Sequence, residues 1–373
     1  MKKIISALLC LAMVLCLVAC GNAATPSSSP AEPAASEPQA PAESSSAGTE
    51  KPYAGQTLVV QVWGGTYEET FKTYAAPMFE ELTGATIEYV LGSTPIAQLG
   101  AEGENPSVDL IHGDAAEIVR GEEMDLFAVI DKSKLSNAAD LYEKAFEYPE
   151  AIATNWGTYG IAYRTDLVEK APTSWFDMWD PQYAGGKVGI MDLGMGGALE
   201  MADVVARTQG YECADQENWD NLFAKLAELK PNVGILASQH ADVEAMLEQG
   251  DVVMCVETNG RAINMMRSGL PVGFCMPEEG VPAMTSYIAL TKHSHNLDLA
   301  YIMADILISP EVQKAYAENN YYAPSNSKAE VAEDLRGFMP YGEDQVDLLV
   351  YIDAAAVEAV KPAFTERWNA IYK

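Results

Sequence analysis

The sequence predicts an α/β protein in which strands and helices alternate along the chain. Short apolar runs with strand character are each followed by a stretch of helical periodicity, and this order implies parallel strands. The chain has 373 residues, which is enough for two domains with a core each. Its 49% hydrophobic and 21% charged residues are ordinary for a globular protein.

The folded part is expected to begin near Tyr53 with a strand–helix–strand unit. Thr66 can cap the first helix, whose apolar residues recur at helical spacing. Pro77 is expected to kink or restart that helix, and Gly84 to end it. The predicted strands of this region are 58–63, 85–90 and 108–111.

The alternation continues through the rest of the chain. Gly250 is placed to end one predicted helix, and Asn296 to cap the start of another. The predicted strands are 187–191, 252–256, 272–275 and 286–290. The predicted helices are 197–210, 219–229, 241–249, 297–308, 310–319, 344–360 and 364–372.

The first twenty residues have the features of an export signal. Lys2 and Lys3 precede an apolar stretch at 4–18 that is too short for a comfortable membrane span. Residues 17–20, with the sequence LVAC, resemble the lipobox of bacterial lipoproteins, in which the cysteine is acylated and becomes the first residue. We therefore expect a signal peptide at 1–19 and a lipid anchor on Cys20.

A tether is predicted to follow the lipidated cysteine. Residues 21–50 contain only Gly, Asn, Ala, Thr, Pro, Ser, Glu and Gln. Because such a segment buries little apolar surface, it cannot offset the entropy lost on ordering. We expect residues 20–52 to be a disordered spacer between the lipid and the folded part.

The charge balance excludes two kinds of partner, nucleic acid and anionic lipid surfaces. The chain carries 54 acidic and 23 basic residues, a net charge of −31. Such a surface repels nucleic acid and anionic lipid headgroups. It attracts cations only weakly at long range, and the simpler interpretation of the charge is solubility.

Three cysteines, Cys213, Cys255 and Cys275, remain after the signal and the lipidated residue are set aside. Because three is an odd number, at least one of them is free. Cys255 and Cys275 lie in two strand-like runs and could pair if those strands touch. Buried reduced thiols are the equal alternative.

The sequence contains no familiar catalytic signature, whether a Walker A loop, G-x-S-x-G, H-E-x-x-H or C-x-x-C. His293 and His295 could suggest a metal pair, but their polar surroundings favour an exposed loop. His112 ends a strand and could face either a cleft or the core. The glycines at 194–197 resemble a phosphate loop only superficially, and an anion nest is the minor alternative.

Five segments in collinear order resemble the spermidine/putrescine-binding proteins of ABC importers. The resemblance runs from about Leu58 to about Asn326, while the remaining residues match only in being helical. Each motif is weak alone, but their shared order and spacing are specific. The segments are 130–135, 173–179, 230–233, 309–313 and 322–326.

The resemblance implies a type II periplasmic-binding-protein fold, with two α/β lobes flanking a central cleft. By analogy the chain crosses between the lobes near 159–163, near 284–286 and after Asn326. Lobe one would then comprise 53–160 and 285–327. Lobe two would comprise 161–284 and 328–373.

Trp63 is the leading candidate for the ligand site. It ends the first predicted strand, where open α/β sheets bind ligands, and Gly64 and Gly65 let a ligand approach the backbone. In the polyamine binders an aromatic residue matching Trp63 lies on the ligand; the alternative is a core tryptophan. Tyr67 could either line the pocket or lie at the rim of the cleft. Tyr322 matches a family tyrosine at the cleft.

Two carboxylates could accept hydrogen bonds from an ammonium group. Asp114 follows the third predicted strand, where the family has a ligand-contacting serine. It could equally be the N-cap of a helix at 115–121. Asp192 ends the strand that begins at Lys187 and is a similar candidate.

The chain departs from the polyamine binders at most positions that clamp the amine. The matching positions hold Leu193, Gly196 and Thr285 in place of acids, and Thr258 and Ala283 in place of aromatic residues. Asp192 and Glu257 lie beside them and could substitute. We therefore expect a smaller or more polar ligand in a pocket that includes Thr258 and Thr285. Arg261 could contact a carboxylate or phosphate, or lie on the surface.

The resemblance implies a capture protein without enzymatic activity. It would bind a small polar or cationic solute, polyamine-like or a related amine, close around it and deliver it to ABC permease subunits. We expect a monomer with no cofactor and no metal, held by its lipid on the outer face of the bacterial cytoplasmic membrane (periplasmic in a Gram-negative cell). Two alternatives stay open: a secreted enzyme using Asp114 and Asp192 as a carboxylate pair, and a receptor-coupled sensor of the same fold.

Overall fold

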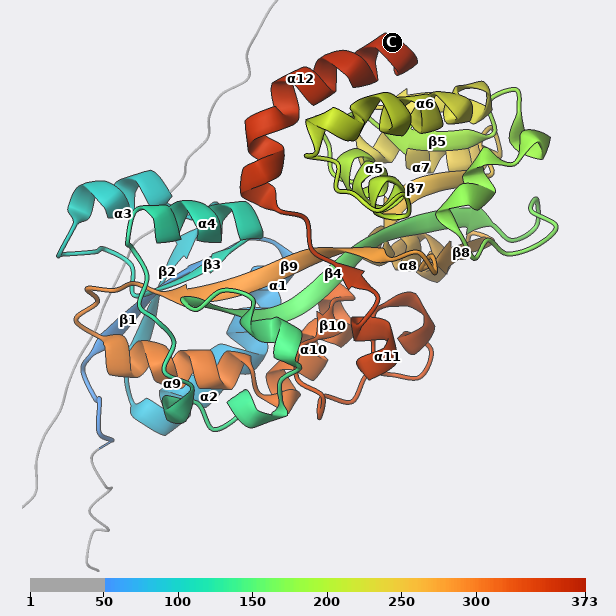
Figure 1. Cartoon of the computed structure of the whole chain (residues 1–373). Coiled ribbons are helices and arrows are strands. Elements are labelled where there is room, and N and C mark those ends of the chain that lie inside the picture. The colour runs from blue at the N-terminus through green and yellow to red at the C-terminus, as the bar shows by residue number, and fades with distance from the viewer. Residues whose placement is uncertain (1–50) are drawn as a thin grey trace, which may run out of the picture. The chain divides into compact units, whose positions relative to one another are not determined.

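The computed structural model describes residues 51–373, in which strands and helices alternate as predicted (Figure 1). The expected signal peptide, the anchor on Cys20 and the tether as far as residue 50 lie outside the described residues. The strands are β1 (Thr57–Val62), β2 (Thr86–Leu91), β3 (Leu110–Gly113), β4 (Ala151–Arg164), β5 (Val188–Met191), β6 (Val233–Ala237), β7 (Met254–Thr258), β8 (Val272–Cys275), β9 (Val281–Leu290), β10 (Ala323–Pro324) and β11 (Leu349–Val350).

The helices fall between these strands and after them. They are α1 (Thr66–Thr70), α2 (Ala76–Thr83), α3 (Ile96–Glu102), α4 (Ala115–Glu123), α5 (Ala198–Arg207), α6 (Trp219–Leu229), α7 (His240–Gln249), α8 (Asn259–Arg267), α9 (Leu297–Leu307), α10 (Pro310–Asn320), α11 (Glu343–Val346) and α12 (Ala354–Tyr372). A π-helical stretch, Phe71–Ala75, joins α1 to α2, and Pro77 sits in the first turn of α2. Residues 66–83 therefore stay helical without a break, and Pro77 lies just after the π-helical irregularity.

The strands form a path in the order β2-β1-β3-β9-β4-β7-β5-β6. The strands at the two ends of this path pair in parallel, as the βαβ order predicts. The two longest strands, β4 and β9, pair antiparallel at its centre. β4 pairs with β9 as far as Thr158 and with β7 and β8 from Tyr159 onward. The chain thus passes from one set of strands to the other between Thr158 and Tyr159.

Two apolar layers cover the two faces of the sheet around β1, β3 and β9. Successive residues alternate between the layers, as strand geometry requires: Leu110 and Ile288 enter one layer, and Ile111 and Ala289 the other. Helices α2 and α9 pack on the first face, while α3 and α4 pack on the second (Figure 1). The second layer also receives apolar residues of 331–349.

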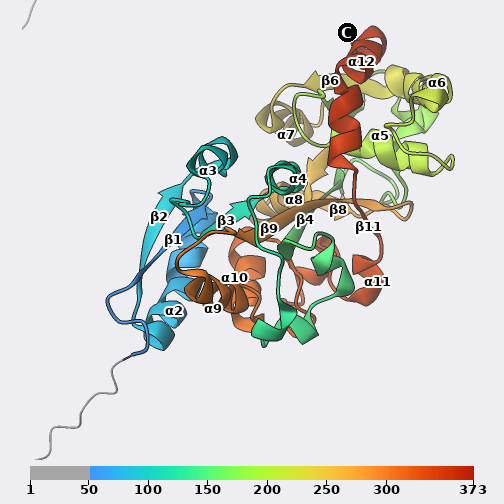
Figure 2. The same cartoon turned by 60° about the vertical axis from the view of Figure 1, so that its left-hand side comes forward.

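A third apolar cluster surrounds β5 and β7. Its residues come mainly from 161–275, with α5, α6 and α7 around the strands. The C-terminal helix α12 joins this cluster through Phe364 and Trp368, which are fully buried. Helix α12 therefore lies beside α5 and α6 (Figure 2).

The three cysteines within residues 51–373 are reduced. Cys213, Cys255 and Cys275 are all free and buried. Ala162 of β4 pairs with Cys255 of β7, and Ile161 pairs with Cys275 of β8, so β4 lies between the two thiols. The sequence left open a Cys255–Cys275 disulfide or buried reduced thiols, and the structure shows the reduced thiols.

The predicted helix 344–360 is wrong at its centre. The structure has the short helix α11, then β11, and α12 begins only at Ala354, where Asp353 accepts a hydrogen bond from Ala356 N. In contrast, α12 runs through Pro362, where the sequence predicted a break. A proline removes one helical hydrogen bond, but the buried rings of Phe364 and Trp368 hold the second half of the helix in place.

Candidate functional site

Two adjoining cavities lie where β4 and β9 pass from the strands around β1 and β3 to the strands around β5 and β7. We call them the polar pocket, with a volume of about 600 Å³, and the acidic pocket, with a volume of about 590 Å³. Tyr159, Met284 and Tyr322 line both, so the two cavities adjoin at these side chains. Volumes of this size suit a small organic molecule.

Trp63 lies in the wall of the acidic pocket. It follows the last residue of β1, and its ring is half-buried. Tyr67 supports it from behind, because the two rings meet edge to face with centroids 5.0 Å apart. The indole therefore presents one part of its surface to the cavity and the rest to packed neighbours.

Tyr67 is buried and supports the wall without being part of it. It is absent from the linings of both pockets, and its ring packs against Tyr316 at 4.5 Å and against Tyr322 at 6.3 Å. Asn155 Nδ2 donates a hydrogen bond to the hydroxyl at 3.4 Å. Burial raises the pKa of Tyr67 to about 12, so the hydroxyl is neutral near pH 7.

His112, which the sequence left open between cleft and core, belongs to the core. It is fully buried, and its Nδ1 lies 2.7 Å from Gln61 O. Its ring packs near those of Trp63 and Tyr67, at 6.0 and 5.6 Å. Burial lowers the pKa of His112 to about 4, so it adds no charge at neutral pH.

Four carboxylates line the acidic pocket: Asp114, Glu147, Glu200 and Glu358. Asp114 is the N-cap of α4, where it accepts from Glu117 N at 2.8 Å, and it also lines the cavity. Burial raises the pKa values of Glu147 and Glu200, and hydrogen bonds from Tyr287 and from Gly197 N oppose the increase. A cation in this pocket would offset the cost of burying the charged forms of Glu147 and Glu200.

The turn before α5 brings Glu200 to the cavity. Gly197 N donates to Glu200 Oε2 at 2.7 Å, which fixes the carboxylate at the start of the helix. Gly196 leaves room for Tyr159, since a Cβ at this position would stand 1.8 Å from the Tyr159 hydroxyl. The glycine-rich turn at 194–197 therefore serves close packing against a cleft tyrosine.

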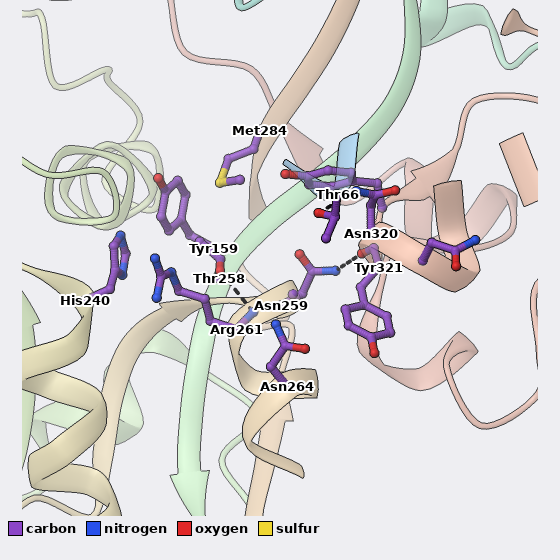
Figure 3. Close-up of a pocket in the computed structure, with 13 residues that line it drawn as sticks. Thr66, Tyr159, His240, Thr258, Asn259, Arg261, Asn264, Met284, Asn320 and Tyr321 are labelled. Atoms are coloured by element: carbon purple, nitrogen blue, oxygen red, sulfur yellow. Dashed lines mark hydrogen bonds between the residues drawn. The ribbon is translucent and has the colours of Figure 1, made fainter. Parts of the chain in front are cut away.

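Thr258 lines the polar pocket and is the N-cap of α8, because its hydroxyl accepts from Arg261 N. Glu257 is fully buried behind it. Glu257 Oε1 accepts from Thr258 N at 2.7 Å and lies 2.8 Å from His240 Nδ1, while His240 itself lines the cavity (Figure 3). Glu257 thus holds two wall residues without reaching the pocket itself.

Asn259 joins the two strand sets at the floor of the polar pocket. Its Oδ1 accepts from Thr158 N at 3.1 Å, and its Nδ2 donates to Tyr321 O at 2.8 Å (Figure 3). Tyr321 has a positive φ of 61°, which turns the chain from α10 into β10. This turn delivers Tyr322 to both pockets.

The two remaining predicted residues take different positions. Thr285 lines the acidic pocket from β9, opposite Trp156 of β4. Asp192 is absent from the linings of both pockets and pairs with Lys373 Nζ at 2.7 Å. The structure therefore brings Trp63, Asp114 and Thr285 together around one cavity and Thr258 into the other.

Sequence reasoning missed a wall that comes from the C-terminal region. Val357, Glu358 and Lys361 of α12 line the acidic pocket together with Asp114–Ala116 at the start of α4. The sequence signal that could have revealed this wall is the pair Glu358 and Lys361, which are three residues apart in the otherwise apolar first two turns of α12. Tyr159 and Met284 were also missed as wall residues, although the resemblance placed chain crossings at their positions.

A model of the bacterial extracellular solute-binding protein family matches residues 75–335, which is more than half of the chain. The chain belongs to this family. A spermidine/putrescine-binding periplasmic protein of Escherichia coli strain K12 is 30% identical over 220 residues, covering 55% of this chain and 61% of that protein. The gamma-aminobutyric acid-binding protein of Pseudomonas aeruginosa is 29% identical over 225 residues, covering 58% and 62%. Both matches span less than two thirds of the relative's length.

The solute-binding protein also resembles solved structures over most of its length. The crystal structure of an ABC transporter from Clostridium perfringens is 26% identical, with a TM-score of 0.73, and covers 85% of this chain and 100% of that one. The predicted type II periplasmic-binding-protein fold is therefore confirmed. This family consists of extracellular solute-binding proteins and not of enzymes. Among residues 51–373, no helix is long and apolar enough to span a bilayer.

Proposed function

We propose that this solute-binding protein captures a small amine in the cleft and delivers it to the permease of an ABC importer. One observation carries the proposal: carboxylates surround the cavity whose wall includes the half-buried indole of Trp63. Carboxylates bind an ammonium group by charge-assisted hydrogen bonds, and an indole face attracts cations and methylene groups. The named ligands of the two relatives, spermidine or putrescine and gamma-aminobutyric acid, are amines.

The proposed lobes are 53–160 with 285–327 and 161–284 with 328–373, although the apolar residues of 331–349 pack in the layer beside α3 and α4 of lobe one. Both pockets receive residues from each lobe, such as Trp63 and Glu200 in the acidic pocket. A solute that contacts both walls binds the closed form more tightly, and this difference in affinity drives closure about β4 and β9. The permease would then recognise the closed form.

The proposal includes the membrane anchor. A monomer acylated at Cys20, after removal of 1–19, would be held on the outer face of the membrane by its lipid alone.

The enzyme alternative needs Asp114 and Asp192 on one cavity, but Asp192 is paired with Lys373 outside both linings. We therefore propose capture without turnover.

Titration calorimetry of the purified protein against putrescine, spermidine, 4-aminobutyrate and butylamine tests the proposal. We expect saturable heat with at least one of these amines, and recovery of the same amine unchanged after incubation. Absence of heat with all four would contradict amine capture. Conversion of a bound amine to a product would contradict a transport role.

A further inference from the structure

We infer that Lys361 of α12 is a specificity residue of the acidic pocket, where its tethered ammonium group takes the place of a second ammonium group of the ligand. The pocket then accepts a solute with one ammonium group and disfavours diamines and polyamines. This inference rests on the proposed function and assigns a role to a lysine on the C-terminal helix.

The acidic pocket has two walls of different charge. The start of α4 and the turn before β4 bring Asp114 and Glu147 to one wall. Helices α5 and α12 form another wall, which holds Glu200, Glu358 and Lys361. Among residues 51–373, Lys361 is the only Lys, Arg or His that lines this pocket. A resident cation is therefore present at one wall and absent from the other.

Helical geometry directs Lys361 toward the cavity. Val357, Lys361, Phe364 and Trp368 are spaced by four, three and four residues, so they form one stripe along α12. The other three members of the stripe are buried, and Val357 also lines the acidic pocket. The first turns of α12 lie beside α4 (Figure 1). The lysine thus takes the inward-facing position at which the stripe meets the cavity.

Two carboxylates surround the ammonium group of Lys361. Its Nζ donates to Glu358 Oε2 at 3.3 Å. Burial raises the pKa of Glu200, and the charge of Lys361 is among the influences that oppose the increase. An exposed pair of charges on one helix contributes little by itself. The effect on Glu200, which reaches the cavity from a different helix, distinguishes Lys361 from an ordinary surface lysine.

This arrangement treats two ligand ammonium groups differently. One ammonium group at the wall of Asp114 and Glu147 meets carboxylates without a resident cation. A second ammonium group at the wall of α5 and α12 would share its carboxylates with Lys361, and like charges repel. The Lys361 side chain is 47% exposed, so solvent screens part of this repulsion. We therefore expect a selectivity of several-fold, and a neutral hydroxyl at the same place would escape the repulsion.

Calorimetry with two matched ligands tests the inference. Putrescine and 4-aminobutan-1-ol have the same chain and differ only in an ammonium or hydroxyl group at one end. We expect the parent protein to bind the amino alcohol at least as tightly as putrescine. Lys361→Gln should raise the affinity for putrescine relative to the amino alcohol by about fivefold or more. Lys361→Arg keeps the charge and should keep the ratio of the parent protein.

The matched control is Arg367→Gln on the same helix. Arg367 pairs with Asp220 at 2.7 Å, and neither residue lines the acidic pocket, so the ratio should not change. A ratio of two affinities is independent of the fraction of folded protein. An unchanged ratio in Lys361→Gln, or tighter binding of putrescine by the parent protein, would overturn the inference and leave amine capture intact. If neither ligand binds to the parent protein or to the variants, amine capture itself is wrong, and the inference falls with it.

Discussion

At the scale of single residues, the site depends on Trp63 and on the side chains that hold it. The ring of Tyr67 packs on the indole, and Tyr67 is itself held by Tyr316 and by Asn155. The indole has a rigid position before any ligand arrives. A preorganised wall loses little conformational entropy on binding, so its contacts contribute directly to affinity.

Replacing Trp63 should therefore affect binding more than folding. We expect Trp63→Leu to weaken amine binding by at least tenfold, about 1.4 kcal/mol, because the leucine lacks the aromatic surface. Tyr74→Leu is the control, since Tyr74 is an exposed aromatic residue outside both pocket linings. Calorimetry gives the affinities, and circular dichroism checks the fold. Equal affinities for the two variants would remove Trp63 from the site.

A second prediction at this scale concerns Glu122 of α4. Burial raises the pKa of Glu122 to about 7 from its ordinary 4.5, and the nearby carboxylates of Glu150 and Glu147 add to the increase. Because the folded state binds this proton more tightly than the unfolded state, Glu122 favours folding below pH 4.5. That contribution is lost as the pH rises through about 7.

Urea unfolding at several pH values between 4.5 and 8 measures this effect. We expect Glu122→Gln to make the free energy of unfolding fall less steeply with pH than in the parent protein. Glu123→Gln is the matched control, because its side chain is exposed on the same helix. The same pH slope in Glu122→Gln and the parent protein would show that Glu122 titrates normally.

At the scale of elements, β4 and α12 show what sequence patterns could not predict. Residues 151–162 of β4 are buried without interruption, and the strand contains Gly157 and Gly160. Neither the alternation typical of a half-buried strand nor a run of β-branched residues was present to indicate it. Gly160 is required by tertiary contact, since a Cβ there would stand 2.3 Å from Cys275 O. Local sequence carries no signal for such a contact.

Helix α12 ties the end of the chain to the cluster around β5 and β7. Phe364 packs between Trp219 and Phe223 of α6, with centroids 5.6 and 4.8 Å away, and Trp368 is fully buried. We expect Trp368→Ala to lower the free energy of unfolding by about 3–5 kcal/mol, as for other large-to-small changes in a core. Denaturant unfolding would measure the change.

The control for this prediction lies on the same helix. Glu366 is exposed, so Glu366→Ala should stay within about 0.5 kcal/mol of the parent protein. A loss below 1 kcal/mol in Trp368→Ala would show that α12 is not part of this core. The first turns of α12 line the acidic pocket, so a loosened helix should also weaken ligand binding.

At the scale of the whole molecule, the fold was predictable from the sequence, but the composition of the cleft was only partly so. The local sequence pattern was enough to predict Trp63 and Asp114 as candidates, because each directly follows a strand and ligands of α/β sheets bind at the carboxyl ends of strands. Glu147 and Glu358 could not be predicted this way. They reach the acidic pocket from a turn before β4 and from the C-terminal helix, and long-range packing alone brings them together.

The central claim is that the acidic pocket beside Trp63 holds the ammonium group of a small amine. A crystal structure of the protein grown with 4-aminobutyrate tests it most directly. We predict that its ammonium group lies among Asp114, Glu147 and Glu200. A ligand bound outside the acidic pocket, or one whose ammonium group contacts none of these carboxylates, would contradict the account.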